Sequence, residues 1–194
     1  ISEIELSENL DASERAVHLE LLPNADPSRL AAVTRLDGLT GATCAPPESP
    51  RTMDLWGSAL VSDTVSGATL SRHARSFFQG NRFLLQPLVD HVLSHVTQGP
   101  VLDLYAGVGL FSLAAAQAGH RPVIAVEGDR FAAADLRRNA TGRDDVHVRT
   151  EPVERYLPAA TKTATVVVDP PRTGLSKEAM AGVVALHSPT LVYV

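Results

Sequence analysis

The stretch Val101-Leu-Asp-Leu-Tyr-Ala-Gly-Val-Gly-Leu-Phe111 decides the fold of this chain. Its first four residues are mostly apolar and predict a buried strand, and a helical pattern begins after its second glycine. Gly107 and Gly109 allow the backbone to turn sharply and to approach a ligand closely. The stretch therefore predicts a strand, a ligand-binding loop and a helix, in that order.

Strand-like and helix-like segments alternate on both sides of this stretch. The apolar residues from Leu88 to Val96 have helical spacing, and Pro87 suits the first turn of that helix. Alternating strands and helices form a parallel sheet covered on both faces, so we predict an α/β fold for residues 71–194. We expect strands at 101–104, 122–126, 146–148, 165–168 and 191–194, and helices at 110–118, 130–139, 153–157 and 176–186.

Residues 1–70 predict a separate, small α+β subdomain. The expected elements are a strand at 17–21, a helix from Asp26-Pro27 to about Leu36, a short strand toward Cys44, and a hairpin from Ser58 to Leu70 that turns at Ser66-Gly67. The domain boundary is therefore expected between residues 70 and 71.

Composition narrows the class of protein. The formal net charge is −5, and the first 70 residues carry the acidic excess, so any polyanion-binding face is expected in the second part. Cys44 is the one cysteine, which excludes an internal disulfide framework and predicts no cysteine-based metal site. No segment resembles a membrane span, and the first residues do not resemble a signal peptide. We therefore expect a cytoplasmic protein, and both ends look like edges of a longer one.

Polar residues lie where ligands bind in such sheets, at the carboxyl ends of the strands. Glu127 follows the second strand of this region and can accept both hydroxyls of a ribose. A dinucleotide and S-adenosylmethionine share this plan, but the dinucleotide fingerprint needs a third glycine where this chain has Ser112. Asp103 also suits a ligand with an amino group. Both residues favour S-adenosylmethionine.

A rigid polar loop follows the fourth strand, with the sequence Asp169-Pro-Pro-Arg-Thr-Gly174. Two consecutive prolines hold the flanking Asp169 and Arg172 at the end of the strand. Asp169 would face the cofactor or a target base, and Arg172 would bind a base oxygen or a phosphate. The alternative is a loop that simply ends the strand.

Taken together, these motifs resemble the RNA uracil-C5 methyltransferases, which make 5-methyluridine in transfer and ribosomal RNA. The resemblance covers about residues 71–194, whereas residues 1–70 resemble the family's central subdomain only in outline. It implies a Rossmann-like class I methyltransferase fold, S-adenosylmethionine as cofactor and RNA as partner. The matching stretches are Ser76-Phe-Phe-Gln-Gly-Asn81, Asp103 to Leu113, Val126-Glu-Gly128, Asn139-Ala140, Asp169 to Gly174 and Leu191-Val-Tyr-Val194.

The resemblance also implies roles for individual residues. Gln79 would contact the methionine end of the cofactor, Tyr105 would pack on it, and Glu127 would hold its ribose, with Asp169 as a fourth cofactor position. Phe78 would stack on a flipped base and Phe77 would belong to the core. Two departures from the family concern the details of this site: Leu110 stands where many members have a polar residue, and Pro152 or Glu151 lies near a position that is often polar.

In this family a cysteine thiolate adds to carbon 6 of uracil, which makes carbon 5 nucleophilic. The resemblance places that cysteine in a turn two residues beyond Val194, so we expect no catalytic cysteine within the chain. Cys44 lies in a proline-rich loop and is expected to be structural or incidental. We therefore expect the 194 residues to bind cofactor without methylating RNA themselves.

Other hypotheses stay open at this point. The chain could belong to a methyltransferase with another substrate, or to an RNA-binding module without catalysis; a nicotinamide-dependent enzyme is disfavoured by Ser112. Arg72, Arg75 and Arg82 predict either a phosphate-binding edge or a solvated polar face. His73 is expected in a solvated loop.

Overall fold

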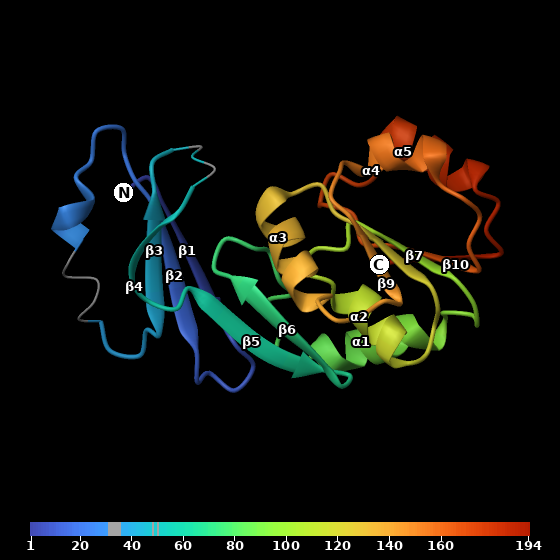
Figure 1. Cartoon of the computed structure of the whole chain (residues 1–194), viewed down its shortest axis with the longest axis horizontal. Helices are drawn as coiled ribbons and strands as arrows, with labels where there is room; N and C mark the ends of the chain where they lie inside the picture. The colour runs from blue at the N-terminus through green and yellow to red at the C-terminus, as the bar shows by residue number, and fades with distance from the viewer. Residues whose placement is uncertain (31–35, 48, 50) are drawn as a thin grey trace. The chain divides into compact units, whose positions relative to one another are not determined.

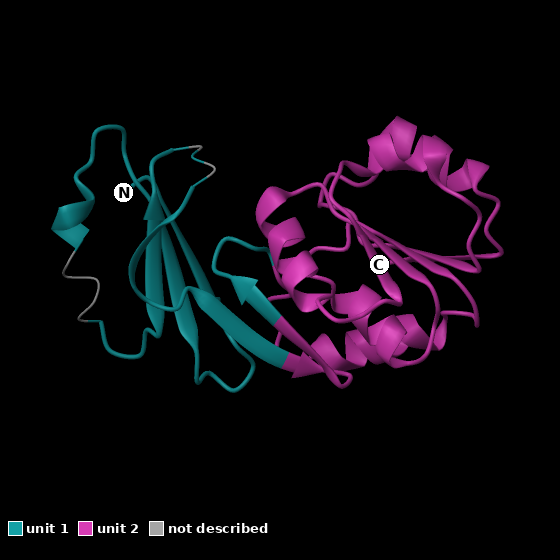
Figure 2. Cartoon of the chain, in the orientation of Figure 1, with its two compact units in different colours: residues 1–63, 71–77 teal, residues 64–70, 78–194 magenta. Residues whose placement is uncertain are grey.

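We describe the fold from a computed structural model, which covers residues 1–30, 36–47, 49 and 51–194 (Figure 1). The chain divides into two compact units (Figure 2). Unit 1 comprises residues 1–63 and 71–77, and unit 2 comprises residues 64–70 and 78–194. Among the described residues, no helix is both long enough and apolar enough to cross a membrane.

Unit 1 is built on a four-stranded sheet with the order β1-β2-β3-β4. The two inner strands, β2 (Arg15–Glu20) and β3 (Gly41–Ala45), are parallel and buried, and they match the two strands predicted there. The two outer strands, β1 (Glu3–Glu8) and β4 (Met53–Gly57), were not anticipated. Of the helix expected from Asp26-Pro27 to about Leu36, residues 27–30 form a 3-10 turn, and residues 31–35 lie outside the described part of the chain.

A buried ion pair lies within the hairpin formed by β5 (Leu60–Val65) and β6 (Ala68–His73), and its arginine also bonds to β1. The Arg72 guanidinium contacts the Asp63 carboxylate at 2.5 Å and donates to the carbonyl of Glu8 at 2.8 Å. Arg72 therefore neither lines a phosphate-binding edge nor lies on a solvated face, and both readings of this residue are wrong. The neighbouring Arg75 side chain is also largely covered and pairs with Glu5.

Unit 2 contains the predicted parallel sheet, with the order β11-β10-β7-β8-β9. The strands lie within a residue of their expected bounds: β7 (Val101–Leu104), β8 (Val123–Val126), β9 (Val146–Arg149), β10 (Thr165–Val168) and β11 (Thr190–Tyr193). The chain runs outward from β7 through β8 to β9, and then returns to the other side of β7 for β10 and β11. The direction of strand addition therefore reverses between β7 and β10.

Helices cover both faces of this sheet (Figure 1). Leu102 and Leu104 point to the face that packs against α4 (Val153–Tyr156), the short 3-10 helix η2 (Leu157–Ala159) and α5 (Lys177–Ala185). Asp103 points to the opposite face, where its carboxylate meets Ser112 of α2 (Leu110–Gln117). The helices α1 (Leu85–Ser94) and α3 (Arg130–Asn139) complete the unit, and Pro87 lies in the first turn of α1 as expected.

Candidate cofactor site

The loop between β7 and α2 has the shape that the two glycines predict. Gly109 caps α2 with a φ of +100°, and an added Cβ there would lie 2.7 Å from Cδ1 of Leu136, so a larger residue would strain the backbone and displace that side chain. Gly107 also has a positive φ, but nothing lies within 4 Å of where its Cβ would be. The loop is thus packed against the unit at Gly109 and open at Gly107, where a ligand can reach the backbone.

Glu127 holds this loop in place from the end of β8. Its carboxylate accepts a hydrogen bond from the backbone N–H of Gly107 at 2.7 Å and another from the N–H of Asp129 at 2.6 Å. The side chain is buried, and burial raises its pKa despite these bonds. Each carboxylate oxygen has two lone pairs, so Glu127 retains the capacity to accept ribose hydroxyls.

Asp103 is completely buried beneath the same loop. One carboxylate oxygen, Oδ2, accepts a hydrogen bond from the Ser112 hydroxyl, and the other has no partner among the described residues. Burial, reinforced by the charges of Asp169 and Glu127, raises the pKa of Asp103 to about 7. Ser112 therefore binds the strand carboxylate, at the position where a dinucleotide fingerprint has its third glycine.

The loop after β10 brings two further predicted residues together. The side-chain amide of Gln79 donates to Oδ2 of Asp169 at 3.2 Å, although the two residues are 90 positions apart. The backbone N–H of Asp169 lies 3.4 Å from the carbonyl of Leu104, beside the start of the glycine loop. Burial raises the pKa of Asp169, and the bond from Gln79 partly offsets this.

Asp103, Glu127 and Asp169 thus form a cluster of carboxylates at the carboxyl edge of three adjacent strands. The charges of Glu127 and Asp169 raise the pKa of Asp103, and no salt bridge involves any of the three within the described residues. The described residues also contain no group of three His, Cys, Asp or Glu side chains arranged to hold a metal ion. The cluster therefore favours an organic ligand that carries positive charge and hydroxyl groups.

Three contacts at this edge were not predicted from the sequence. The hydroxyl of Tyr105 donates to Oε1 of Glu154 at 3.4 Å, and the hydroxyl of Ser176, which caps α5, donates to the same oxygen at 2.8 Å. The side-chain amide of Asn139 donates to the carbonyl of Val108 in the glycine loop at 2.9 Å. Asn139 belongs to one of the stretches that resemble the family, so the sequence could have pointed to it. Nothing in the sequence singles out Glu154.

The residues expected to face the substrate are more scattered. Arg172 is exposed in the loop after β10, and Phe78 is half-buried just before Gln79. Phe77 is 76% exposed, so its expected place in the core is wrong. His73 is half-buried and bonded to Thr43 and to the backbone of Arg75, and is thus not a solvated loop residue.

Cys44 is the fourth residue of β3, in the core of unit 1, so its expected place in a proline-rich loop is wrong. Its side chain is fully buried, and burial raises the pKa of the thiol. A buried thiol with a raised pKa forms little thiolate and cannot reach a substrate. The structural role expected for Cys44 agrees with this environment.

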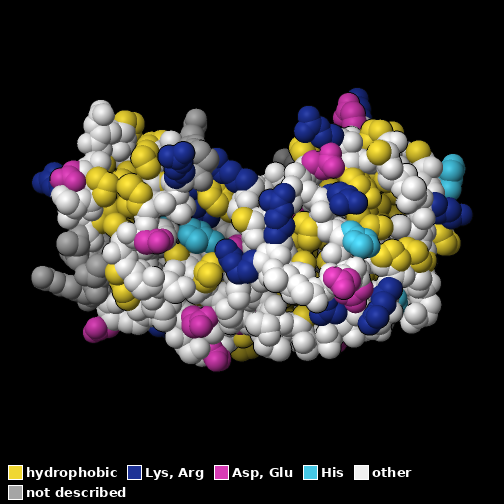
Figure 3. All heavy atoms as spheres, viewed as in Figure 1, with side chains coloured by type: hydrophobic (Ala, Val, Ile, Leu, Met, Phe, Trp, Pro, Cys, Tyr) yellow, Lys and Arg dark blue, Asp and Glu magenta, His cyan; other side chains and the backbone are white. Residues whose placement is uncertain are grey.

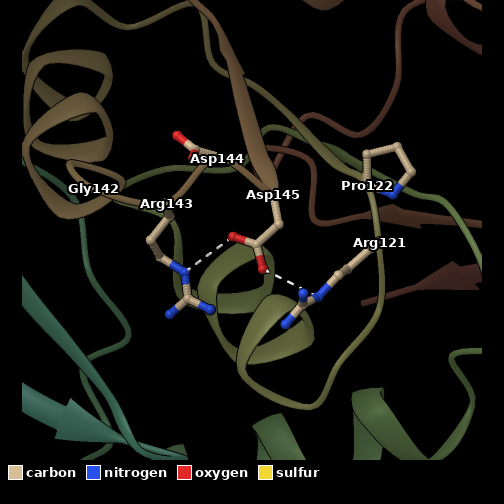
Figure 4. A pocket seen from close by; sticks show the side chains of 6 residues that line it. All are labelled: Arg121, Pro122, Gly142, Arg143, Asp144 and Asp145. Atoms are coloured by element: carbon tan, nitrogen blue, oxygen red, sulfur yellow. Dashed lines mark ion pairs between the residues drawn. The ribbon is translucent and has the colours of Figure 1, made fainter.

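A separate hollow of about 670 Å³ lies at the opposite edge of the parallel sheet, before the first residues of β8 and β9 (Figure 4). It is lined by charged residues, and Asp145 lies between the guanidinium groups of Arg121 and Arg143, each at 3.5 Å. The two ion pairs leave little net charge to attract a ligand. Ligands of such sheets bind at the carboxyl edge, so this hollow is not the candidate site.

Comparisons with known proteins agree with this fold. The chain matches no protein-family profile. It is 31% identical over 153 residues to an uncharacterized RNA methyltransferase of Listeria monocytogenes serotype 4b, a match that covers 74% of this chain and 34% of that protein. It is also 31% identical over 128 residues to the tRNA (uracil(54)-C(5))-methyltransferase of Pyrococcus horikoshii, covering 62% of this chain and 29% of that protein.

A solved structure shows the same fold over nearly the whole chain. The crystal structure of Pyrococcus abyssi tRNA (uracil-54, C5)-methyltransferase in complex with S-adenosyl-L-homocysteine matches with a TM-score of 0.75 and 24% identity, covering 97% of this chain and 48% of that one. The fold is therefore that of class I methyltransferases. The chain spans about a third of the length of the curated relatives it matches. It belongs to the RNA uracil-C5 methyltransferase family.

Proposed function

We propose that this chain is the cofactor-binding part of an S-adenosylmethionine-dependent methyltransferase that modifies carbon 5 of a uridine in transfer or ribosomal RNA. The observation that carries the proposal is the carboxylate cluster beneath an open glycine loop. S-adenosylmethionine carries a sulfonium and an amino group, both cationic at neutral pH, and a ribose with two hydroxyls. A site rich in buried carboxylates matches that pattern of charge and hydroxyls.

The residues have complementary roles in this proposal. Glu127 binds the ribose hydroxyls with its remaining lone pairs while it holds Gly107. Asp169 and Gln79 bind the methionine end, and a cationic group bound above Asp103 favours the ionised form of that carboxyl, which then stabilises the cation. The cofactor supplies the methyl group. The domain that holds it is proposed to begin near residue 71.

The proposed substrate side uses Arg172 and Phe78. Arg172 is exposed beside Asp169 and would bind a base oxygen or a phosphate, and Phe78 would contact the flipped base. Addition to carbon 6 requires a thiolate, and the buried Cys44 is unsuited to that step. We therefore propose that these 194 residues bind the cofactor but do not complete methyl transfer on their own.

Calorimetric titration of S-adenosylmethionine and S-adenosylhomocysteine into the chain tests the cofactor site. Glu127→Gln is expected to weaken both ligands by about 10-fold or more, because an uncharged side chain binds ribose hydroxyls less strongly. Glu178→Gln, the same change on the exposed first turn of α5, is the matched control and should have no effect. Absence of binding to the unmodified chain would refute the cofactor site and leave an RNA-binding module.

Methyl transfer is tested separately with radiolabelled S-adenosylmethionine and a uridine-containing RNA. We expect no incorporation by the chain alone. Incorporation would contradict the proposal that the nucleophile is not among these residues. Incorporation at a position other than carbon 5 of uridine would instead contradict the proposed specificity.

A further inference from the structure

An exposed aromatic side chain stands close in sequence to the candidate site. Phe83 is 83% exposed and the adjacent Leu84 is 58% exposed, although both are large apolar residues. They occupy the turn that leads into α1, between Asn81 and the fully buried Leu85. An exposed aromatic residue in a conformation fixed on both sides is available for contact with a partner.

The local backbone fixes this exposure. The side-chain oxygen of Asn81 accepts a hydrogen bond from the N–H of Phe83 at 3.1 Å, and the backbone carbonyl of Asn81 accepts one from the N–H of Leu84 at 3.1 Å. Leu85 anchors the next residue in the core. The turn therefore directs Phe83 outward instead of leaving it to collapse onto unit 2.

The same segment is attached to the candidate site. Gln79, four residues before Phe83, donates to Asp169 at the end of β10. Residues 76–84 contain no acidic side chain, and they include Arg82; Arg172 follows Asp169 by three residues, and both arginines are exposed. An exposed aromatic side chain next to an arginine, here Arg82, in a segment without acidic residues is typical of a surface that binds single-stranded nucleic acid.

The area of the exposed apolar surface distinguishes between possible partners. A stable protein interface buries about 800 Å² on each partner, whereas an aromatic side chain buries about 150–250 Å². Phe83 and Leu84 together fall well short of a protein interface, but they match the face of one nucleobase. On the face of the molecule in Figure 3, Lys and Arg are scattered among acidic side chains and do not form one continuous basic field. Local stacking is therefore a more suitable source of affinity than long-range charge.

We propose that Phe83, supported by Leu84, is a stacking platform for an unpaired base of the RNA substrate. The proposal rests on the proposed function, because it takes the RNA to be the partner of the adjacent site. The platform would hold a nucleotide near the target uridine and keep that region of the RNA single-stranded. Base–aromatic stacking contributes about 1–3 kcal/mol per base, which corresponds to about 5- to 150-fold in affinity.

The test is fluorescence anisotropy with a short, labelled, single-stranded uridine-containing RNA in the presence of S-adenosylhomocysteine. Phe83→Ala and Phe83→Leu should both weaken binding by at least about 5-fold, and Phe83→Trp should retain it, because only an aromatic ring stacks. Val184→Ala truncates another exposed apolar side chain, on α5, and serves as the control, with no expected effect. A duplex RNA of the same sequence should not distinguish the variants.

Several outcomes would overturn the platform. These are wild-type affinity in Phe83→Ala, wild-type affinity in Phe83→Leu, no measurable RNA binding by the unmodified chain, or a dimer in sedimentation that depends on Phe83. Calorimetry with S-adenosylhomocysteine separates this proposal from the proposed function. If the unmodified chain binds the cofactor product and the Phe83 variants bind it equally well, a loss of RNA affinity is specific to the platform. If the unmodified chain binds no cofactor product, the cofactor site itself fails.

Discussion

Replacement of Asp103 by asparagine should remove most of the change in folding stability that the titration of Asp103 causes. Asp103 is fully buried, and its pKa in the folded chain is about 7, compared with 3.8 for an unperturbed aspartate. Between these values the folded chain keeps a proton that the unfolded chain has released. Folding stability must therefore fall as the pH rises through this window, and it levels off above pH 7.

The size of the effect follows from the shift. Each pH unit in the window lowers the free energy of unfolding by about 1.4 kcal/mol, so the decrease between pH 5 and pH 7 is about 2.7 kcal/mol. Asparagine can still accept the hydrogen bond from Ser112, and it has no charge to desolvate. Its NH₂ group would replace the unpartnered oxygen of Asp103, at a cost of about 1–3 kcal/mol. Asp103→Asn should thus be less stable than the unmodified chain at pH 5 and similar or more stable at pH 8.

Urea denaturation at several pH values, followed by circular dichroism, measures this difference. Asp144→Asn makes the same substitution at an exposed position and should leave the pH profile parallel to that of the unmodified chain. The reasoning fails if the profiles of Asp103→Asn and the unmodified chain are also parallel between pH 5 and pH 8. In that case burial of the carboxylate would not perturb its titration.

Three further outcomes follow from contacts within the units. Gly109→Ala should lower the free energy of unfolding by about 1–3 kcal/mol in urea denaturation, because the added Cβ meets Leu136 at a positive φ; no loss of stability would contradict the packing described. Tyr105→Phe and Glu154→Gln should each weaken S-adenosylhomocysteine binding, and the double variant should lose no more than either single one; additive losses in calorimetry would show that the two side chains act separately. Arg72→Met should lower the free energy of unfolding by about 3–5 kcal/mol because it leaves a buried carboxylate unpaired, and a change below 1 kcal/mol would disprove that burial.

The parallel sheet could be predicted almost completely from the sequence, whereas the sheet of unit 1 could not. The strands of unit 2 are short apolar runs bounded by helices, so a short stretch of local sequence is enough to predict each strand. In contrast, β1 and β4 are edge strands: Ile4 and Leu6 in β1 are exposed, and Leu55 and Trp56 in β4 are only partly buried. Their pairing depends on partners elsewhere in the sheet, which a local pattern does not reveal.

In the candidate site, too, some residues could be placed from the sequence and others could not. Position after a strand was enough to place Glu127 and Asp169 at one edge, and their residue types suggested the chemistry. Sequence could not show that Arg72 would be buried, because β1, whose Ser7 and Glu8 accept hydrogen bonds from Arg72, is more than 60 positions away along the chain. Nor could it show that Phe77 would be exposed, since a single aromatic residue carries no periodicity.

The reversal of strand order between β7 and β10 has a consequence for how such a protein can change. In the proposed site, Glu127 after β8 holds the ribose, whereas the loop after β10 carries both Asp169, proposed to bind the methionine end, and Arg172, proposed to face the RNA. Substitutions at Arg172 leave the hydrogen bond between Glu127 and Gly107 untouched, because that bond lies on the other side of the reversal. A change of RNA target would therefore need only the outer residues of the β10 loop to alter, while Glu127 and Asp169 keep the proposed cofactor site.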